Sequence, residues 1–344
     1  MRLVPSRGSR LEVLAQRTRR IVAPLDLHRH VNRTRAILRD ISPDLVHALR
    51  IPFEGMLASM AVHECPLLMS VWGLDFTLVA RESPISALYT RRAVKRADAL
   101  HADCHRDIRL AGECGFSSGK PSIVLPGAGG IHTDTFFPEQ SNAPLQEELN
   151  LKGHSPVVIN PRGVREYVRN EAFFRAIPLV LRSCPETVFL CSAMADSDWA
   201  RNWVSRLGIE SSVRLLPAVP HPRMAAYFRL AQVAVSPSVH DGTPNTLLES
   251  MACGCFPVAG DIEPLREWIT EGVNGLLCNP DNPAAIAGAI VRSLGDDSLR
   301  ERARRHNAQL IADRAEYATV MRSAASFYDH VVRQHSLGTA VIEG

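Results

Sequence analysis

Short apolar runs of strand length alternate with amphipathic stretches of helical period along almost the whole of this 344-residue chain. Buried strands that alternate with helices of this length form parallel sheets wound by right-handed crossovers. The sequence therefore predicts an α/β fold of doubly wound parallel sheets, with strands at 44–48, 67–72, 97–102, 123–126, 157–160, 188–191, 213–216, 233–236, 256–259 and 275–278.

The chain length suits two domains rather than a single core. The polar stretch 139–153 separates two series of strands, so we expect an N-terminal domain over 1–150 and a C-terminal domain over 151–315. A helix over 316–344 follows, and we leave open whether it packs back on the N-terminal domain. We expect the domains to face a cleft lined by the loops that follow the strands, because open α/β sheets bind ligands there.

Charge and composition limit the partners of the chain. Residues 1–50 carry eleven Arg and four acidic residues, a net charge of +7 that permits contact with an anionic membrane; a solvated arginine face is the alternative. Nucleic acid is not expected, since aromatic residues make up only 6% and interleave with no basic stripe. Eight cysteines and the lack of an apolar leader indicate a reduced, cytoplasmic chain, with peripheral contact at the inner membrane face left open.

The strongest motif is the run 236–254, SPSVHDGTPNTLLESMACG. A strand ends at its start, a tight loop from Asp241 to Pro244 follows, and a helix begins near Asn245. The free N–H groups that open such a helix form an anion site suited to a diphosphate. Glu249 lies one turn inside the helix, within reach of a ribose diol. An ordinary helix preceded by an acidic loop is the alternative.

The spacing of Asp241 and Glu249 inside this run resembles the signature of the retaining glycosyltransferases of family 4. The similarity continues downstream in the PVA run 257–259 and in EGVNGLL at 271–277, and upstream in SPDLVH at 42–47 and LPGAGGIHTDTFF at 125–137. It covers roughly residues 40–335 and is most specific in the C-terminal half. The resemblance implies the GT-B architecture, with two Rossmann-like domains and the donor nucleotide on the C-terminal one.

The resemblance also implies a role for each matching residue. Glu249 would bind the donor ribose, and Asp241 would lie against the transferred sugar. The backbone of the intervening loop would line the sugar pocket, and the first N–H groups of the helix would meet the diphosphate. These further donor-binding residues are Gly242, Thr243, Pro244, Asn245, Thr246 and Leu247.

A positive clamp on the phosphates is the remaining part of the implied site. Arg162 follows the strand 157–160 and matches the arginine of the family's clamp, where it would stabilise the leaving phosphate. No Lys follows at the family's spacing, so Arg165 or Arg169 is expected to replace it. With fixed positive charge in place we expect no metal and no cofactor, only a nucleotide-diphosphate sugar as co-substrate.

The N-terminal half departs from the family pattern in two places. The family's His-Gly-x-Asp run reads Trp72-Gly73-Leu74-Asp75, and Trp cannot relay a proton. We expect Trp72 and Gly73 to wall the acceptor side and Asp75 to orient the acceptor or stabilise charge; a turn aspartate is the alternative. No glycine-rich strand and loop precede residue 43, so we expect a shortened N-terminal domain that lacks about one strand–helix–strand unit.

We therefore expect a retaining, metal-independent hexosyltransferase that moves a sugar from a nucleotide-diphosphate donor to a glycan, lipid-linked or small-molecule acceptor. A non-catalytic nucleotide-sugar- or carbohydrate-binding relative and a GT-B sugar-nucleotide epimerase remain as alternatives. The triplet 196–198 (DSD) and the run 101–105 (HADCH) contain metal-ligand residue types, but helix starts explain both better.

Overall fold

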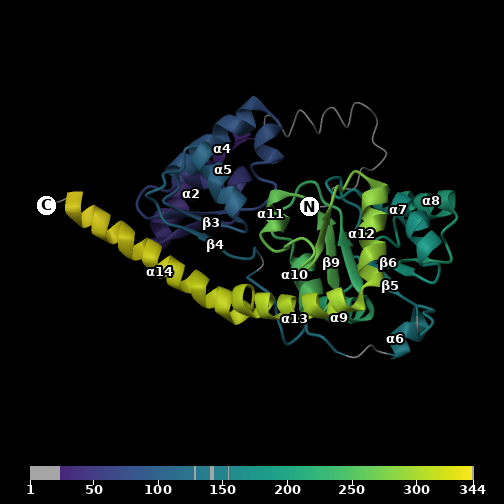
Figure 1. The fold of residues 1–344 in the computed structure, drawn as a ribbon. Helices are drawn as coiled ribbons and strands as arrows, with labels where there is room; N and C mark the ends of the chain where they lie inside the picture. Colours follow the sequence, from purple (N-terminus) through teal and green to yellow (C-terminus); the bar gives the residue numbers. More distant parts are fainter. Residues whose placement is uncertain (1–23, 128, 140–142, 154, 343–344) are drawn as a thin grey trace, which may run out of the picture. The chain divides into compact units, whose positions relative to one another are not determined.

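The computed structural model describes residues 24–127, 129–139, 143–153 and 155–342, which form two compact units (Figure 1). The first unit contains Met1–Gly127 and Met321–Gly344, and the second contains Ala128–Val320. The boundary therefore falls at Gly127 and not at residue 150, where we expected it. The reason is packing, because Ile131, Phe136 and Leu149 enter the core of the second unit.

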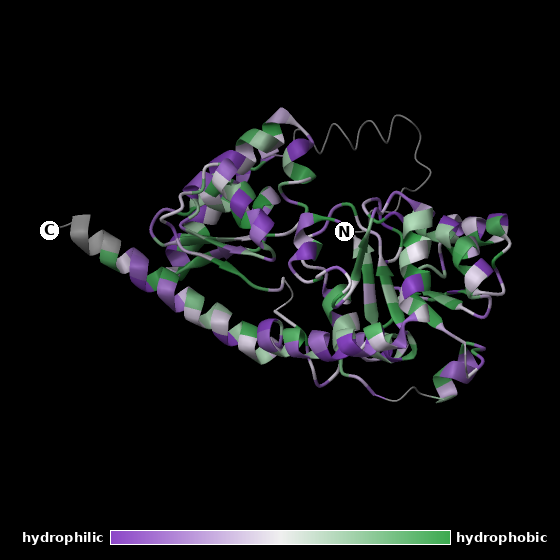
Figure 2. Ribbon diagram, viewed as in Figure 1, coloured by the Kyte–Doolittle hydropathy of each residue, from purple (hydrophilic) through white to green (hydrophobic). Residues whose placement is uncertain are grey.

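The second unit is built on a six-stranded parallel sheet in the order β10-β9-β8-β5-β6-β7. The strands β5, β6 and β8 are buried along their whole length, and the sheet is coloured mostly as hydrophobic in Figure 2, because both of its faces are covered. The strand order reverses between β5 and β8, which makes their adjacent ends a topological switch point. The strands are β5 Val157–Asn160, β6 Val188–Cys191, β7 Val213–Leu215, β8 Val233–Ser236, β9 Phe256–Gly260 and β10 Leu276–Cys278.

Helices pack on both faces of this sheet. Phe173 and Ile290 belong to the core on one face, and Phe228 and Leu248 belong to the core on the other. The stretch 139–153 is not a bare linker, because a short helix there buries Leu145. The helices are α6 Ala143–Glu148, α7 Asn170–Ser183, α8 Asp198–Leu207, α9 His221–Leu230, α10 Asn245–Ala252, α11 Glu263–Arg266, α12 Pro283–Gly295 and α13 Asp297–Arg314.

The first unit has a four-stranded parallel sheet in the order β1-β2-β3-β4. Its main core includes Met69 and Leu100, while the alternate positions Leu68 and Ala99 pack against Val331 of the C-terminal helix α14. None of the described helices is long and apolar enough to cross a bilayer. The elements are α2 His28–Ile41, β1 Val46–Ala48, α3 Met56–Ala61, β2 Leu67–Val71, α4 Pro84–Arg96, β3 Ala99–Ala102, α5 His105–Glu113, β4 Ser122–Val124 and α14 Tyr317–Ile342, with short helical turns at Ile51–Gly55 and Val79–Arg81.

Candidate functional site

Two loops leave the carboxyl ends of β5 and β8 at the switch point and are tied to each other. Val168 of the first loop forms an antiparallel bridge with Ser238 of the second, and the N–H of Val239 donates to the carbonyl of Tyr167 at 3.0 Å. The end of β9 also lies close to the second loop, since a Cβ on Gly260 would lie 2.1 Å from the Ser238 carbonyl oxygen. The two loops therefore hold a fixed distance from each other, and glycine is required at position 260.

A buried pair of asparagines fixes the start of the loop after β5. Asn160 ends the strand, and its Oδ1 accepts from the N–H of Arg162 at 3.1 Å. Its Nδ2 donates to Asn170 Oδ1 at 3.0 Å, and Asn170 Nδ2 donates to the carbonyl of Gly163 at 2.9 Å. We did not predict this pair, although a polar residue that ends an otherwise apolar strand is a usable signal. The pair orients the backbone from which the Arg162 side chain leaves.

The Arg162 guanidinium crosses to the loop after β8. Its Nη2 lies 2.6 Å from Asp241 Oδ2, and its Nη1 donates to Thr246 Oγ1 at 3.3 Å. The side chains of Arg162 and Asp241 are only 10% and 13% exposed. The structure thus brings together residues 162, 241 and 246, and the guanidinium faces the start of α10 instead of bulk solvent.

The first turn of α10 supplies backbone donors beside this guanidinium. Asn245 and Thr246 are the first two helical residues, so their N–H groups have no acceptor within the helix. Leu247 differs from our expectation, because its N–H donates to the carbonyl of Pro244 at 3.0 Å and its side chain is buried in the core. Pro244 is the residue before the helix, and its carbonyl accepts this hydrogen bond from Leu247. Two N–H groups of this turn, and not three, are therefore available to an anion.

Thr243 and Trp268 fix the loop that precedes α10. The indole Nε1 of Trp268 donates to Thr243 Oγ1 at 3.0 Å, and both residues are buried. The Thr243 hydroxyl is therefore engaged with the protein, and its backbone is the part that could line a sugar pocket together with Gly242. The ring of Trp268 in turn packs in the core of the second unit.

Glu249 lies one helical turn after the start of α10. The residue is 7% exposed, and burial raises the pKa of its carboxyl group, an effect that the nearby His221 opposes. Among the described residues, the side chain of Glu249 accepts no hydrogen bond. His221 is the first residue of α9. A largely desolvated carboxylate that accepts no hydrogen bond from the protein is able to accept from the hydroxyl groups of a ligand.

Arg165 and Arg169, the two candidates for the second clamp cation, have different partners in the structure. Arg169 Nε lies 2.5 Å from Asp281 Oδ1, so this guanidinium is engaged in an exposed ion pair. Arg165 Nε donates to the carbonyl of Arg162 at 3.1 Å, and its side chain is exposed. Arg165 is therefore held next to Arg162, whereas Arg169 is turned towards Asp281.

The predicted acceptor-side residues lie after β2 in the first unit. Asp75 is buried, its Oδ1 lies 2.8 Å from Arg50 Nη2, and its Oδ2 accepts from the N–H groups of Ile51 and Trp72 at 3.3 and 3.2 Å. Burial raises the pKa of the Asp75 carboxyl group, which Arg50 opposes. These contacts within one unit favour the alternative that we left open, an aspartate that stabilises a turn.

Trp72 and Gly73 differ in their availability. The indole of Trp72 is 49% exposed, with the Arg50 guanidinium 5.3 Å from its ring centre. The carbonyl of Gly73 is occupied, because Arg106 Nη2 donates to it at 2.8 Å. The Trp72 ring is thus the part of this predicted pair that a ligand could reach.

The two motifs with metal-ligand residue types are helix starts, as expected. Ser197 caps α8 by accepting from the N–H of Ala200 at 3.3 Å. Cys104 precedes α5, and ligand atoms of Asp103, Cys104 and Asp107 lie within 4.8 Å of one another. Arg106 Nη2 lies 2.8 Å from Asp107 Oδ1, so the carboxylate of Asp107 is already paired with a guanidinium.

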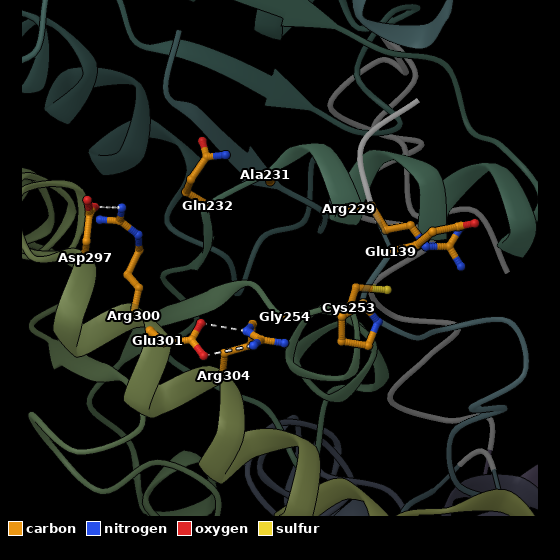
Figure 3. Close-up of a pocket in the computed structure, with 11 residues that line it drawn as sticks. Glu139, Arg229, Ala231, Gln232, Cys253, Gly254, Asp297, Arg300, Glu301 and Arg304 are labelled. Carbon is orange, nitrogen blue, oxygen red and sulfur yellow. Dashed lines mark hydrogen bonds and ion pairs between the residues drawn. The ribbon is translucent and has the colours of Figure 1, made fainter. Parts of the chain in front are cut away.

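A hollow of about 610 Å³ lies at the other end of the second sheet, beside Gln232, which precedes β8 (Figure 3). Its three arginines all have acidic partners. Arg304 binds both carboxylate oxygens of Glu301 at 2.8 and 2.9 Å, as the dashed lines of Figure 3 mark. Arg229 lies 3.4 Å from Glu139, and Arg300 pairs with Asp297. Since the charges in this hollow neutralise one another, we assign it no ligand.

Comparison with solved structures identifies the fold. Sucrose-phosphate synthase from Thermosynechococcus elongatus matches with a TM-score of 0.76 at 17% identity, covering 90% of this chain and 78% of that one. HepE from Anabaena in complex with UDP matches with a TM-score of 0.73 at 16% identity, covering 87% and 82%. Together with the two parallel sheets, these matches place the chain in the class of GT-B proteins.

Sequence comparison then gives the family. The model of "Glycosyl transferases group 1" matches residues 156–296, and that of "Glycosyl transferase 4-like" matches residues 5–103. The chain belongs to the group 1, family 4 glycosyltransferases.

Curated relatives within this family are distant. D-inositol 3-phosphate glycosyltransferase from Corynebacterium glutamicum is 24% identical over 231 residues, which are 64% of this chain and 54% of the relative. The protein of the same name from Streptomyces avermitilis is 26% identical over 189 residues, which are 52% and 40%. The chain spans about half the length of the curated relatives it matches.

Proposed function

We propose that this chain is a glycosyltransferase that moves a hexosyl group from a nucleotide-diphosphate donor to an acceptor, with retention of the anomeric configuration. The observation that carries the proposal is the pairing of the Arg162 guanidinium with the open start of α10, one turn before the buried carboxylate of Glu249. Cation, backbone donors and carboxylate are the groups needed for a diphosphate joined to a ribose. The name of the curated relatives supports glycosyl transfer, and the UDP bound to HepE supports the same class of donor.

The chemistry that we propose rests on charge stabilisation at the leaving group. As the bond between the anomeric carbon and the phosphate oxygen breaks, negative charge grows on the diphosphate. Arg162 and the N–H groups of Asn245 and Thr246 are fixed before the reaction and need no reorganisation to meet that charge. Arg165 is the second clamp cation in this proposal, so the residues themselves would supply the positive charge without a metal.

The other donor contacts belong to the same proposal. Glu249 would accept hydrogen bonds from the ribose hydroxyls, and the backbone of Gly242 and Thr243 would line the sugar pocket. Because Glu249 has a raised pKa, its ionised form is destabilised by burial and gains when hydroxyl donors arrive. Asp241 would meet the transferred sugar.

The acceptor and the cellular location form the last part of the proposal. The exposed ring of Trp72 could stack on a sugar or other planar face of the acceptor. Arg91, Arg92 and Lys95 are exposed on one side of α4, which supports a peripheral contact with an anionic surface. We propose a cytoplasmic enzyme whose acceptor is a glycan, a lipid-linked sugar or a small molecule.

Release of nucleoside diphosphate from a panel of UDP-, GDP- and ADP-sugars tests the proposal. We expect release from one donor, by slow hydrolysis or by transfer, and a loss of about 100-fold in Arg162→Ala. Glu249→Ala should weaken donor binding. The control is Glu186→Gln, because Glu186 precedes β6 and pairs with Lys152; it should change neither donor binding nor the release of nucleoside diphosphate. A chelator should leave the rate unchanged, and NMR of the product should show the anomeric configuration of the donor.

The same assay distinguishes the proposal from its alternatives. Interconversion of the sugar without release of nucleoside diphosphate would indicate an epimerase. Tight donor binding without release or interconversion would indicate a binding protein, and either result would overturn the proposed transfer.

A further inference from the structure

The guanidinium that we propose for the diphosphate already has an anionic partner. Asp241 Oδ2 lies 2.6 Å from Arg162 Nη2, in a pair that is almost buried. An arginine offers the same planar set of donors to a carboxylate and to a phosphate. Asp241 and a donor diphosphate would therefore compete for the same cation.

Arg162 does not depend on Asp241 for its position. Its Nη1 donates to Thr246 Oγ1 at 3.3 Å, and its backbone N–H is held by Asn160. Its Nε is buried and lacks a hydrogen-bond partner among the described residues. If the carboxylate of Asp241 moved away, the guanidinium would remain at the start of α10 with donors free for a phosphate.

We propose that Asp241 is a placeholder anion that exchanges partners when the donor binds. Without a donor it neutralises Arg162; with a donor the diphosphate takes the guanidinium and the carboxylate turns to the hydroxyls of the transferred sugar. This inference rests on the proposed function and adds a role in selecting between donor and product. A complete nucleotide sugar offers its sugar hydroxyls to the carboxylate of Asp241, whereas a bare nucleoside diphosphate displaces the carboxylate from Arg162 without offering them.

The exchange has a consequence for turnover. Separating a nearly buried carboxylate from its guanidinium is unfavourable, so the return of Asp241 to Arg162 would oppose the bound nucleoside diphosphate once the sugar has gone. Asp241 would thus lower product affinity more than donor affinity. Replacing its charge should therefore tighten product binding selectively.

Calorimetric titration of the full chain tests this exchange with UDP, GDP and ADP, with UDP-glucose, GDP-mannose and ADP-glucose, and with uridine, guanosine and adenosine. For the nucleotide that binds, Asp241→Asn should bind the diphosphate about tenfold more tightly than the wild type, equivalent to about 1.4 kcal/mol. The affinity of Asp241→Asn for the matching nucleotide sugar should be equal to that of the wild type or lower. The matching nucleoside should bind both proteins with the same affinity. Asp241→Glu keeps the charge and should behave like the wild type, as should the exposed control Glu186→Gln.

The possible results separate this inference from the proposed function. If the wild type binds a nucleoside diphosphate and Asp241→Asn binds it equally or less tightly, the placeholder role is wrong while donor binding stands. The role is also wrong if Asp241→Asn tightens the diphosphate and the nucleotide sugar by the same factor. If neither protein binds any of the diphosphates or nucleotide sugars, both the proposed function and the inference fail.

Discussion

Replacement of Asn170 by alanine tests the reasoning about how Arg162 is positioned. Asn170 accepts from Asn160 and donates to the carbonyl of Gly163, at 3.0 and 2.9 Å, and both asparagines are buried. Alanine removes both hydrogen bonds and leaves the Asn160 amide without its acceptor. Because each buried polar group left unpaired costs about 1–3 kcal/mol, we expect the free energy of unfolding to fall by about 3 kcal/mol.

Urea unfolding followed by tryptophan fluorescence reports this change, since Trp199, Trp203 and Trp268 belong to the second unit. With a slope of about 2 kcal/mol per molar urea, the midpoint should fall by about 1.5 M. Asn282→Ala is the matched control in the same unit, because Asn282 only caps α12, where its Oδ1 accepts from Ala284 and Ala285. That cap is worth about 1 kcal/mol, or about 0.5 M urea. A shift for Asn170→Ala no larger than the control's would refute the positioning argument.

Three further predictions follow from the same site. Burial raises the pKa of Glu249 in the folded chain, so the ionised carboxylate destabilises the fold. Glu249→Gln should therefore raise the urea midpoint at neutral pH. This gain should disappear as the pH is lowered to the ordinary glutamate pKa of about 4.3. A gain that grows on acidification would contradict this sign. Gly260→Ala places a methyl group 2.1 Å from the Ser238 carbonyl oxygen and should cost about 3 kcal/mol in urea unfolding. The control Gly288→Ala lies inside α12 and meets nothing within 4 Å, so it should stabilise by about 0.5–1 kcal/mol. Arg162→Lys keeps the charge but loses the planar donor set, so nucleoside diphosphate release should fall by about tenfold or more while the urea midpoint moves little; unchanged release would show that charge alone suffices.

The strands could be predicted from sequence where both faces of the sheet are covered. The runs 157–160, 188–191 and 233–236 became β5, β6 and β8 with the expected bounds, because a strand buried on both sides is a continuous apolar run with polar neighbours. Strands of the first unit were predicted too long: β1 and β4 each have three residues instead of the five and four expected, and β3 has four instead of six. A ladder ends where its hydrogen-bonded neighbour ends, and hydropathy carries no record of that point.

The site could be predicted less completely, because contacts decide it. The motif located the start of α10 and Glu249, since both are local features of one run. It could not show that Pro244 occupies the N–H of Leu247, because that depends on the geometry of the turn. It could not show that Arg50 neutralises Asp75, since a partner 25 residues earlier in the chain leaves no local signal.

The charge of the site follows from the topology rather than from any one motif. Arg162 and Asp241 are 79 positions apart, yet they meet because β5 and β8 are neighbours and both loops leave the same edge of the sheet. The carboxylate of Asp241 cancels the charge of the guanidinium, and Glu249 adds a further negative charge when it ionises. A dianionic phosphate would therefore meet little net positive charge until Asp241 moves. Much of the initial attraction must then come from the first N–H groups of α10 and from exposed Arg165, which makes the orientation of those groups as important to donor binding as the clamp arginine itself.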